Sequence, residues 1–256
     1  MPPEMKPGRV RLVGAGPGAA DLLTLRALRA VEAAEALLYD ALVPEEILAL
    51  APAACLKIQT GKRAGRTSMA QPTINRLMLR LARRGLQVIR LKGGDPSIFG
   101  RVGEEAAFLQ AHGIEIEVIP GVTAACAAAA QFGFPLTHRG EARRVVFTTA
   151  RLEAGTLSAD WATAADPEAT LCVYMGGAAA GELARRLIAA GRPAVTPAAV
   201  VESAGRPEAR RLFAGSLAGL AEARLAGEGG PVLIVVGEVA GLPAVQRLSG
   251  PRAVCA

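Results

Sequence analysis

Short apolar runs alternate with stretches of helical periodicity along the first half of the chain. The runs that are typical of strands cover 9–14, 36–40, 55–59, 86–94 and 114–121. The stretches with apolar residues at helical spacing cover 22–34, 44–51, 71–84, 104–111 and 123–131. Strands and helices in this alternation predict a mostly parallel sheet with right-handed crossovers.

Turn residues and polar groups interrupt this alternation at 133–142, and a second series of elements follows. Its predicted strands are 143–149, 170–176, 197–203, 209–215 and 231–237, and its predicted helices are 178–190 and 216–226. The spacing of the last elements favours a partly antiparallel sheet. We therefore expect an N-terminal α/β domain (1–136), a C-terminal α/β domain with a mixed sheet (137–246) and a loose tail (247–256).

The composition agrees with an α/β protein whose core is built from small aliphatic residues. Hydrophobic residues make up 51% of the 256 residues and aromatic residues only 4%, which suits a parallel sheet covered by alanine-rich helices. No apolar run reaches the roughly 18 residues that suggest a membrane span. The first residues do not resemble a signal peptide, so the cytoplasm is the expected compartment.

Neither cysteines nor charge point to a metal site or to nucleic acid. The four cysteines form no CxxC pair, and two histidines do not supply a typical zinc cluster. The net charge is +6, but the arginines are spread along the chain and few aromatics are available to stack on bases. We expect no metal, no nucleic acid and no membrane partner.

A glycine-rich segment, VGAGPGAA at 13–20, lies between the first predicted strand and helix. Gly14, Gly16 and Ala19 fit the dinucleotide-binding fingerprint, and Asp40 stands where that fingerprint expects a ribose-binding acid. Pro17 counts against this interpretation because it has no N–H to offer a pyrophosphate. A nicotinamide- or flavin-dependent oxidoreductase therefore remains an alternative, beside a purely structural turn.

A second glycine-rich segment, RLKGGDPSIFGRVGEE at 90–105, is more informative. An apolar strand leads into Gly93, Gly94 and Asp95, and ligands of open α/β sheets bind at the carboxyl ends of strands. Glu104 and Glu105 follow in the first turn of a helix, where the helix dipole favours acids. This pattern predicts a site for a small molecule.

The motifs, in their order along the chain, resemble those of the tetrapyrrole methylases. They are VGAGPG, YDALV, GKRAG, RLKGGDPSIFGRVGEE, PGVTAA, PLTHR and VYMGG. The resemblance covers residues 9 to 242 and is greatest to members that methylate uroporphyrinogen III. It implies two α/β domains with the active site in the cleft between them, a homodimer, and S-adenosylmethionine as the methyl donor with S-adenosylhomocysteine as product.

The same resemblance implies roles for individual residues. The positions that match cofactor contacts are Pro17, Gly93, Gly94, Asp95, Ile98, Thr123, Ala124, Met175 and Ala204. Asp40 matches the proton acceptor and Lys62 the proton donor of the family. The expected reaction is two successive methyl transfers to uroporphyrinogen III, giving precorrin-2 by way of precorrin-1, for sirohaem or cobalamin synthesis or both.

The residue types suit this chemistry. The reduced macrocycle supplies a nucleophilic carbon, so the protein mainly aligns the reactants and excludes water. Asp40 can accept the proton that the ring system then loses. Arginines can grip the substrate carboxylates in bidentate fashion, and the candidates are Arg63, Arg66, Arg101 and Arg139.

The chain departs from the family pattern at three positions that concern the substrate more than the cofactor. Ala19 replaces a common acid, Val102 a common glycine, and Thr67 a common histidine. Two further alternatives stay open within this fold: a methylase of ribosomal RNA or of a modified protein residue, and a carrier of tetrapyrrole or cofactor without catalysis.

Overall fold

Five parallel strands form the first sheet. The computed structural model describes residues 8–61, 69–150, 152–153, 156–157 and 166–243. The strands are β1 (Val10–Gly14), β2 (Ala36–Tyr39), β3 (Leu56–Gln59), β4 (Val88–Lys92) and β5 (Ile116–Ile119). Their order is β3-β2-β4-β1-β5, and every neighbouring pair is parallel. The predicted parallel sheet is confirmed, and its central strands are apolar because both faces are covered.

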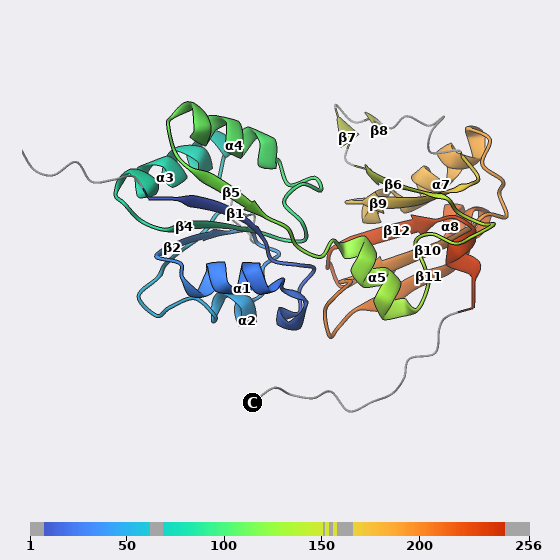
Figure 1. Ribbon diagram of the computed structural model, residues 1–256. Helices are drawn as coiled ribbons and strands as arrows, with labels where there is room; N and C mark the ends of the chain where they lie inside the picture. Colours follow the sequence, from blue (N-terminus) through green and yellow to red (C-terminus); the bar gives the residue numbers. More distant parts are fainter. Residues whose placement is uncertain (1–7, 62–68, 151, 154–155, 158–165, 244–256) are drawn as a thin grey trace, which may run out of the picture. The chain divides into compact units, whose positions relative to one another are not determined.

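Helices cover both faces of this sheet (Figure 1). On one face lie α1 (Leu25–Glu32) and α2 (Glu45–Leu48), which share a core cluster with one side of the strands. On the other face, α3 (Gln71–Arg83) and α4 (Val102–Ala111) enclose a second cluster. The helix α5 (Ala124–Phe132) ends the first series of elements.

The second sheet is mixed, as the sequence predicts. Its strands are β6 (Arg144–Thr149), β9 (Ala169–Tyr174), β10 (Pro197–Glu202), β11 (Arg210–Ser216) and β12 (Val232–Val236). The order is β11-β10-β12-β9-β6; only β6 and β9 pair in parallel. Two short strands that the sequence does not predict, β7 (Leu152–Glu153) and β8 (Thr156–Leu157), pair with each other. The helices α7 (Ala180–Ala189) and α8 (Leu217–Glu222) pack on the second sheet through one core cluster.

The chain divides into two compact units, which we call unit 1 and unit 2. The described part of unit 1 runs to Ala127 and includes Ser203–Ala209, whereas unit 2 comprises Ala128–Glu202 and the described residues from Arg210 onward. The loop between β10 and β11 thus belongs to unit 1, although both strands belong to unit 2. The division expected at 136/137 remains a prediction, and the expected tail, 247–256, lies outside the described residues.

Apart from the unpredicted strands β7 and β8, the main helices and strands are of the expected types, and they differ from the prediction at their ends. The helix expected from residue 22 begins at Leu25, because the Thr24 side chain accepts a hydrogen bond from the Ala27 amide and caps it. The helix expected at 216–226 is shorter and ends at Glu222. Within the described ranges, no helix combines the length and the apolar character needed to cross a bilayer.

Candidate active site

The candidate residues of unit 1 gather at the carboxyl edge of the first sheet. β1 and β4 are neighbours and parallel, so the loops that follow them start side by side. These loops are joined by two backbone hydrogen bonds: the Gly94 amide donates to the Gly16 carbonyl at 2.7 Å, and the Gly16 amide donates to the Gly94 carbonyl at 3.2 Å. Both glycine-rich segments of the sequence therefore belong to one structural feature.

Asp95 organises the loops around it through its side chain. One carboxylate oxygen accepts a hydrogen bond from the Gly121 amide at 2.9 Å, in the loop after β5. The other oxygen accepts from the amide of Ser97 at 2.8 Å and from its hydroxyl at 2.5 Å. The carboxylate thus fixes the conformation of two loops. Because both of its oxygens make these contacts, a ligand at the loops is contacted mainly by their backbone.

The backbone at Gly94 is open to a close approach. Its φ of +70° favours glycine, and a Cβ at this position would meet no atom within 4 Å. The space that a side chain would fill is therefore available beside the Cα. Such a position suits a flat or folded organic ligand that packs against the main chain. This open main chain fits the expected methyl donor.

The first glycine-rich loop does not have the geometry of a dinucleotide site. The Ala15 amide donates to the Lys92 carbonyl at 2.8 Å, and the Ala19 amide donates to the Gly205 carbonyl at 2.9 Å. The Ala20 amide donates to the Glu46 carboxylate at 3.0 Å. A pyrophosphate requires such amides and a helix N-terminus at the loop, but α1 begins only at Leu25. This arrangement counts against the oxidoreductase alternative.

The segment Ser203–Ala209 packs against that loop. Gly205 has a φ of +82°, and a Cβ there would lie 2.2 Å from Cγ of Pro17. Arg206 donates a hydrogen bond to the Leu42 carbonyl at 2.7 Å, in the loop after β2. Ala204 and Pro17, two cofactor candidates that are far apart in sequence, are thereby placed in one region of unit 1.

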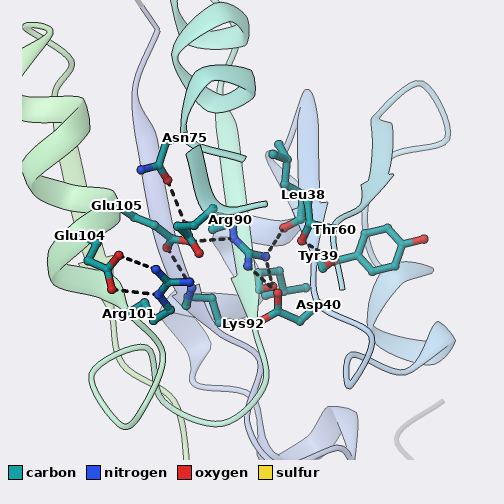
Figure 2. A network of polar contacts seen from close by, with 12 residues as sticks. Leu38, Tyr39, Asp40, Thr60, Asn75, Arg90, Lys92, Arg101, Glu104 and Glu105 are labelled. Carbon is teal, nitrogen blue, oxygen red and sulfur yellow. Dashed lines mark hydrogen bonds and ion pairs between the residues drawn. The ribbon is translucent and has the colours of Figure 1, made fainter. Parts of the chain in front are cut away.

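Asp40 follows β2 directly, and its side chain is 30% exposed. Oδ1 of Asp40 lies 2.5 Å from Nη2 of Arg90, which projects from the neighbouring strand β4 and is only 3% exposed. Nε of Arg90 donates to the fully buried carboxylate of Glu105 at 3.2 Å. Figure 2 shows the chain of contacts from Asp40 through Arg90 to Glu105.

Lys92 completes this buried cluster. Its Nζ lies 2.9 Å from the second oxygen of Glu105, and Gln71 of α3 donates to Glu105 Oε1 at 2.9 Å. Burial, reinforced by the charge of Arg90, lowers the pKa of Lys92 from its ordinary value, although Glu105 acts in the opposite direction. Glu105, expected from its place in the first turn of a helix to complement the helix dipole, has these two cations as its main partners.

Three of the predicted polar residues lie outside the described residues: Lys62, Arg63 and Arg66. Arg101 is half exposed and forms a bidentate ion pair with Glu104, with Nε to Oε1 at 2.8 Å and Nη2 to Oε2 at 2.6 Å. Arg139 is exposed in a tight turn that a bridge between His138 and Ala142 closes. Among the substrate candidates, the structure therefore describes Arg101 in unit 1 and Arg139 in unit 2.

The cofactor candidates are distributed unevenly between the units. All but one lie in unit 1: Pro17, Gly93, Gly94, Asp95, Ile98, Thr123, Ala124 and Ala204. Met175 lies in unit 2, directly after β9, with a φ of +58° that is unusual for a residue with a side chain. It is 53% exposed and borders a hollow of about 440 Å³, whose lining also includes Glu202, Gly227 and Gly230.

Sequence reasoning missed Arg90 and Lys92. The signal was present, because two charged residues two positions apart in an apolar strand point to the same face. Their acidic partner, Glu105, comes from a helix that follows a turn, and no local pattern indicates that this acid turns inward. Arg206 gave no signal for its contact with unit 1, since the Leu42 carbonyl to which it donates lies 164 residues away in the sequence.

Comparison with known proteins decides the family. A family profile described as tetrapyrrole (corrin/porphyrin) methylases matches residues 9–221. The chain belongs to the tetrapyrrole methylases. The predicted family and fold class are thereby confirmed, and the chain is a methyltransferase by membership.

Among solved structures, this tetrapyrrole methylase is similar to uroporphyrin-III C-methyltransferase from Thermus thermophilus, with 42% identity, a TM-score of 0.78, and coverage of 91% of this chain and 93% of that one. A structure of the Thermus enzyme complexed with S-adenosyl homocysteine gives 43% identity and a TM-score of 0.77, over 91% of this chain and 93% of that one. A curated relative, siroheme synthase from Chromobacterium violaceum, is 47% identical over 91% of this chain and 49% of its own length. The chain thus spans about half the length of the curated relatives it matches.

Proposed function

We propose that this protein transfers two methyl groups from S-adenosylmethionine to carbon atoms of uroporphyrinogen III, giving precorrin-2 by way of precorrin-1. The observation that carries the proposal is the position of Asp40. Its carboxylate stands at the carboxyl end of β2, next to the strand that leads into Gly93 and Gly94, and it is held by Arg90. The similarity to the Thermus enzyme and the open backbone at Gly94 support the same assignment.

The methyl donor is proposed to bind at the positions that match the cofactor contacts of the family. When bound, the sulfonium group supplies an already activated methyl. The residues that hold it are Pro17, Gly93, Gly94, Asp95, Ile98, Thr123, Ala124, Met175 and Ala204. In this assignment Gly94 offers open main chain, and the Asp95 side chain keeps the loops in shape. S-adenosylhomocysteine is the expected product, and it is the molecule named in the similar Thermus complex.

Asp40 has the role of general base. Once the ring carbon has formed its bond to the methyl group, the ring system carries an excess proton, which the Asp40 carboxylate accepts. The contact with Arg90 fixes the direction in which this carboxylate points. Lys62, which lies outside the described residues, is proposed as the proton donor on the basis of the family resemblance.

The substrate carboxylates are proposed to meet a set of basic side chains: Arg63, Arg66, Arg101 and Arg139. Arg101 is already paired with Glu104, so a substrate carboxylate takes the place of that glutamate. Because the pair is exposed to water, the exchange costs little free energy. Ala19, Val102 and Thr67 remain the positions where substrate handling is expected to differ from the family pattern.

Precorrin-2 serves sirohaem or cobalamin synthesis, and we propose that the product enters one or both. A curated relative that bears the name siroheme synthase supports the first of these. We further propose that the protein acts as a homodimer in the cytoplasm. Neither RNA nor a modified protein residue is the proposed substrate.

Anaerobic incubation with S-adenosylmethionine and uroporphyrinogen III tests the proposal directly. We expect mass gains of one and then two methyl groups on the tetrapyrrole, with an accompanying change in its absorbance. A parallel reaction with ribosomal RNA or cell protein as methyl acceptor should give no label. Transfer to one of those acceptors, or cofactor binding without any transfer, would overturn the proposed substrate.

A further inference from the structure

Two cations and two carboxylates form a connected cluster inside unit 1 (Figure 2). Arg90 and Lys92 project from the same face of β4, and Glu105 reaches them from the first turn of α4. Arg90 and Lys92 are each 3% exposed and Glu105 is fully buried. Asp40, at 30% side-chain exposure, is the one member of this cluster of four that is open to solvent.

Arg90 connects the solvent-facing member to the buried ones. Its Nη2 contacts Asp40 at 2.5 Å and its Nε donates to Glu105 at 3.2 Å. Its Nη1 donates to the carbonyl of Leu91 at 3.2 Å and lies 3.5 Å from that of Leu38. The planar guanidinium is therefore fixed on three sides by backbone and by Glu105, and its remaining N–H groups are aimed at Asp40.

The two carboxylates depend on Arg90 to different degrees. Glu105 has Lys92 as a second cationic partner and Gln71 as a hydrogen-bond donor. Within the described residues, the contacts of the Asp40 carboxylate are with Arg90. Loss of Arg90 thus leaves Glu105 paired, whereas Asp40 loses the group that orients it.

A role in stability alone does not account for this arrangement. Burying a guanidinium costs free energy that its ion pairs only partly offset, and an apolar side chain of similar volume fills such a space at least as well. A fixed guanidinium does what an apolar side chain cannot: it donates directed hydrogen bonds that set the orientation of a carboxylate.

We propose that Arg90 is a positioning residue for methyl transfer, which fixes the Asp40 carboxylate for proton acceptance and is itself held in place by Glu105. This role rests on the proposed function, in which Asp40 is the general base. Arg90 acts through Asp40 and touches neither the cofactor nor the substrate. Its loss should therefore slow the reaction and leave binding of both intact.

The test compares Arg90→Met and Arg90→Lys with the matched control Lys92→Met. Lys92 neighbours Arg90 on the same strand and shares its partner Glu105, but it has no direct contact with Asp40. For Arg90→Met we expect kcat to fall about 100-fold, as for a catalytic group displaced by about 1 Å. KM for the tetrapyrrole and Kd for S-adenosylhomocysteine, measured by calorimetry, should stay within about twofold. Lys92→Met should retain most of kcat.

Arg90→Lys serves as the second variant if the Met variant does not fold. Lysine keeps the charge, but its ammonium cannot hold Glu105 and Asp40 together as a planar fork does, so kcat should again fall with Kd unchanged. In an Asp40→Asn background, replacement of Arg90 should cause no further loss of kcat. An additional loss in that background, or equal losses in the Arg90 and Lys92 variants, would overturn the positioning role.

The outcomes also separate this inference from the proposed function. If the unchanged protein methylates uroporphyrinogen III and Arg90→Met keeps full kcat, the positioning role is wrong and the proposed function stands. If the unchanged protein binds S-adenosylhomocysteine but methylates no tetrapyrrole, the proposed function is wrong, and the role of Arg90 is overturned with it.

Discussion

The carboxylate of Asp95 accepts a hydrogen bond from the Gly121 amide at 2.9 Å and so ties the loop after β4 to the loop after β5. The same side chain holds Ser97 through its second oxygen. Several proposed cofactor contacts lie on these two loops, among them Gly94 and Thr123. Asp95 and Asp40, two acids at the carboxyl edge of one sheet, are therefore expected to have separate tasks.

Replacement of Asp95 by Ala should weaken cofactor binding, because two loops lose the acceptor that shapes them. Loss of hydrogen bonds to a charged acceptor predicts a Kd for S-adenosylhomocysteine about 10- to 100-fold higher. Calorimetric titration measures this change. The control Ser97→Ala removes only the hydroxyl contact and should change Kd much less.

Replacement of Asp40 by Ala should instead leave Kd nearly unchanged and lower kcat about 10²- to 10⁴-fold, the usual contribution of a general base. The same titration and the anaerobic methylation assay distinguish the two acids. Equal loss of binding in the Asp40 and Asp95 variants would contradict this division of tasks.

Gly205→Ala should destabilise the protein more than a positive φ alone requires. A residue other than glycine in the left-handed region costs about 1–2 kcal/mol, and here the new methyl would also lie 2.2 Å from the Pro17 ring. Gly113→Ala is the matched control, because Gly113 has a φ of +72° and open space where the Cβ would stand. Urea unfolding should show the larger loss for Gly205→Ala, and Kd for S-adenosylhomocysteine should rise only in that variant. Similar losses in the two variants would show that the contact with Pro17 is unimportant.

The adjacent acids Glu104 and Glu105 should respond very differently to replacement by Gln. Glu105 is fully buried between two cations, and removing one partner of a buried ion pair typically costs about 3–5 kcal/mol. Glu104 is exposed and pairs with the exposed Arg101, so its replacement should change the free energy of unfolding far less. Chemical denaturation of both variants measures the difference, and a small effect at Glu105 would mean that the cluster relaxes easily around the missing charge.

The sequence indicated the layers of the fold well because they follow from hydrophobic periodicity. The run RVRLVG predicts the buried strand β1, and the motif KGGDP predicts a ligand-binding loop at the end of β4. Element ends were less accurate, because they depend on caps: Thr24 fixes the start of α1 by accepting from the Ala27 amide.

Contacts between distant segments could not be predicted in the same way. Nothing around Gly205 indicates that its carbonyl accepts a hydrogen bond from the Ala19 amide, since the two residues lie far apart in the sequence. Likewise, Glu105 follows Glu104 in sequence, and only the rotation of α4 decides which of the two turns inward. The family resemblance indicated Asp40 as a site residue, whereas its contact with Arg90 could be recognised only in the folded chain.

The buried ammonium of Lys92 should make stability depend on pH in the alkaline range. Burial and then the charge of Arg90 lower the pKa of Lys92 below its ordinary value of 10.5. Between the lowered pKa and about 10.5, the unfolded chain holds more protons than the folded one, so the contribution of Lys92 to the free energy of unfolding rises with pH.

Lys92→Met removes this contribution. The free energy of unfolding of the variant, minus that of the unchanged protein, should therefore be highest near pH 7 and should fall toward about pH 10. Urea unfolding of both proteins at these two pH values measures the change, with the exposed-site variant Lys57→Met as control, which should show no such trend. A constant difference between the two proteins across this range would mean that the Lys92 ammonium is as well accommodated in the folded protein as in water.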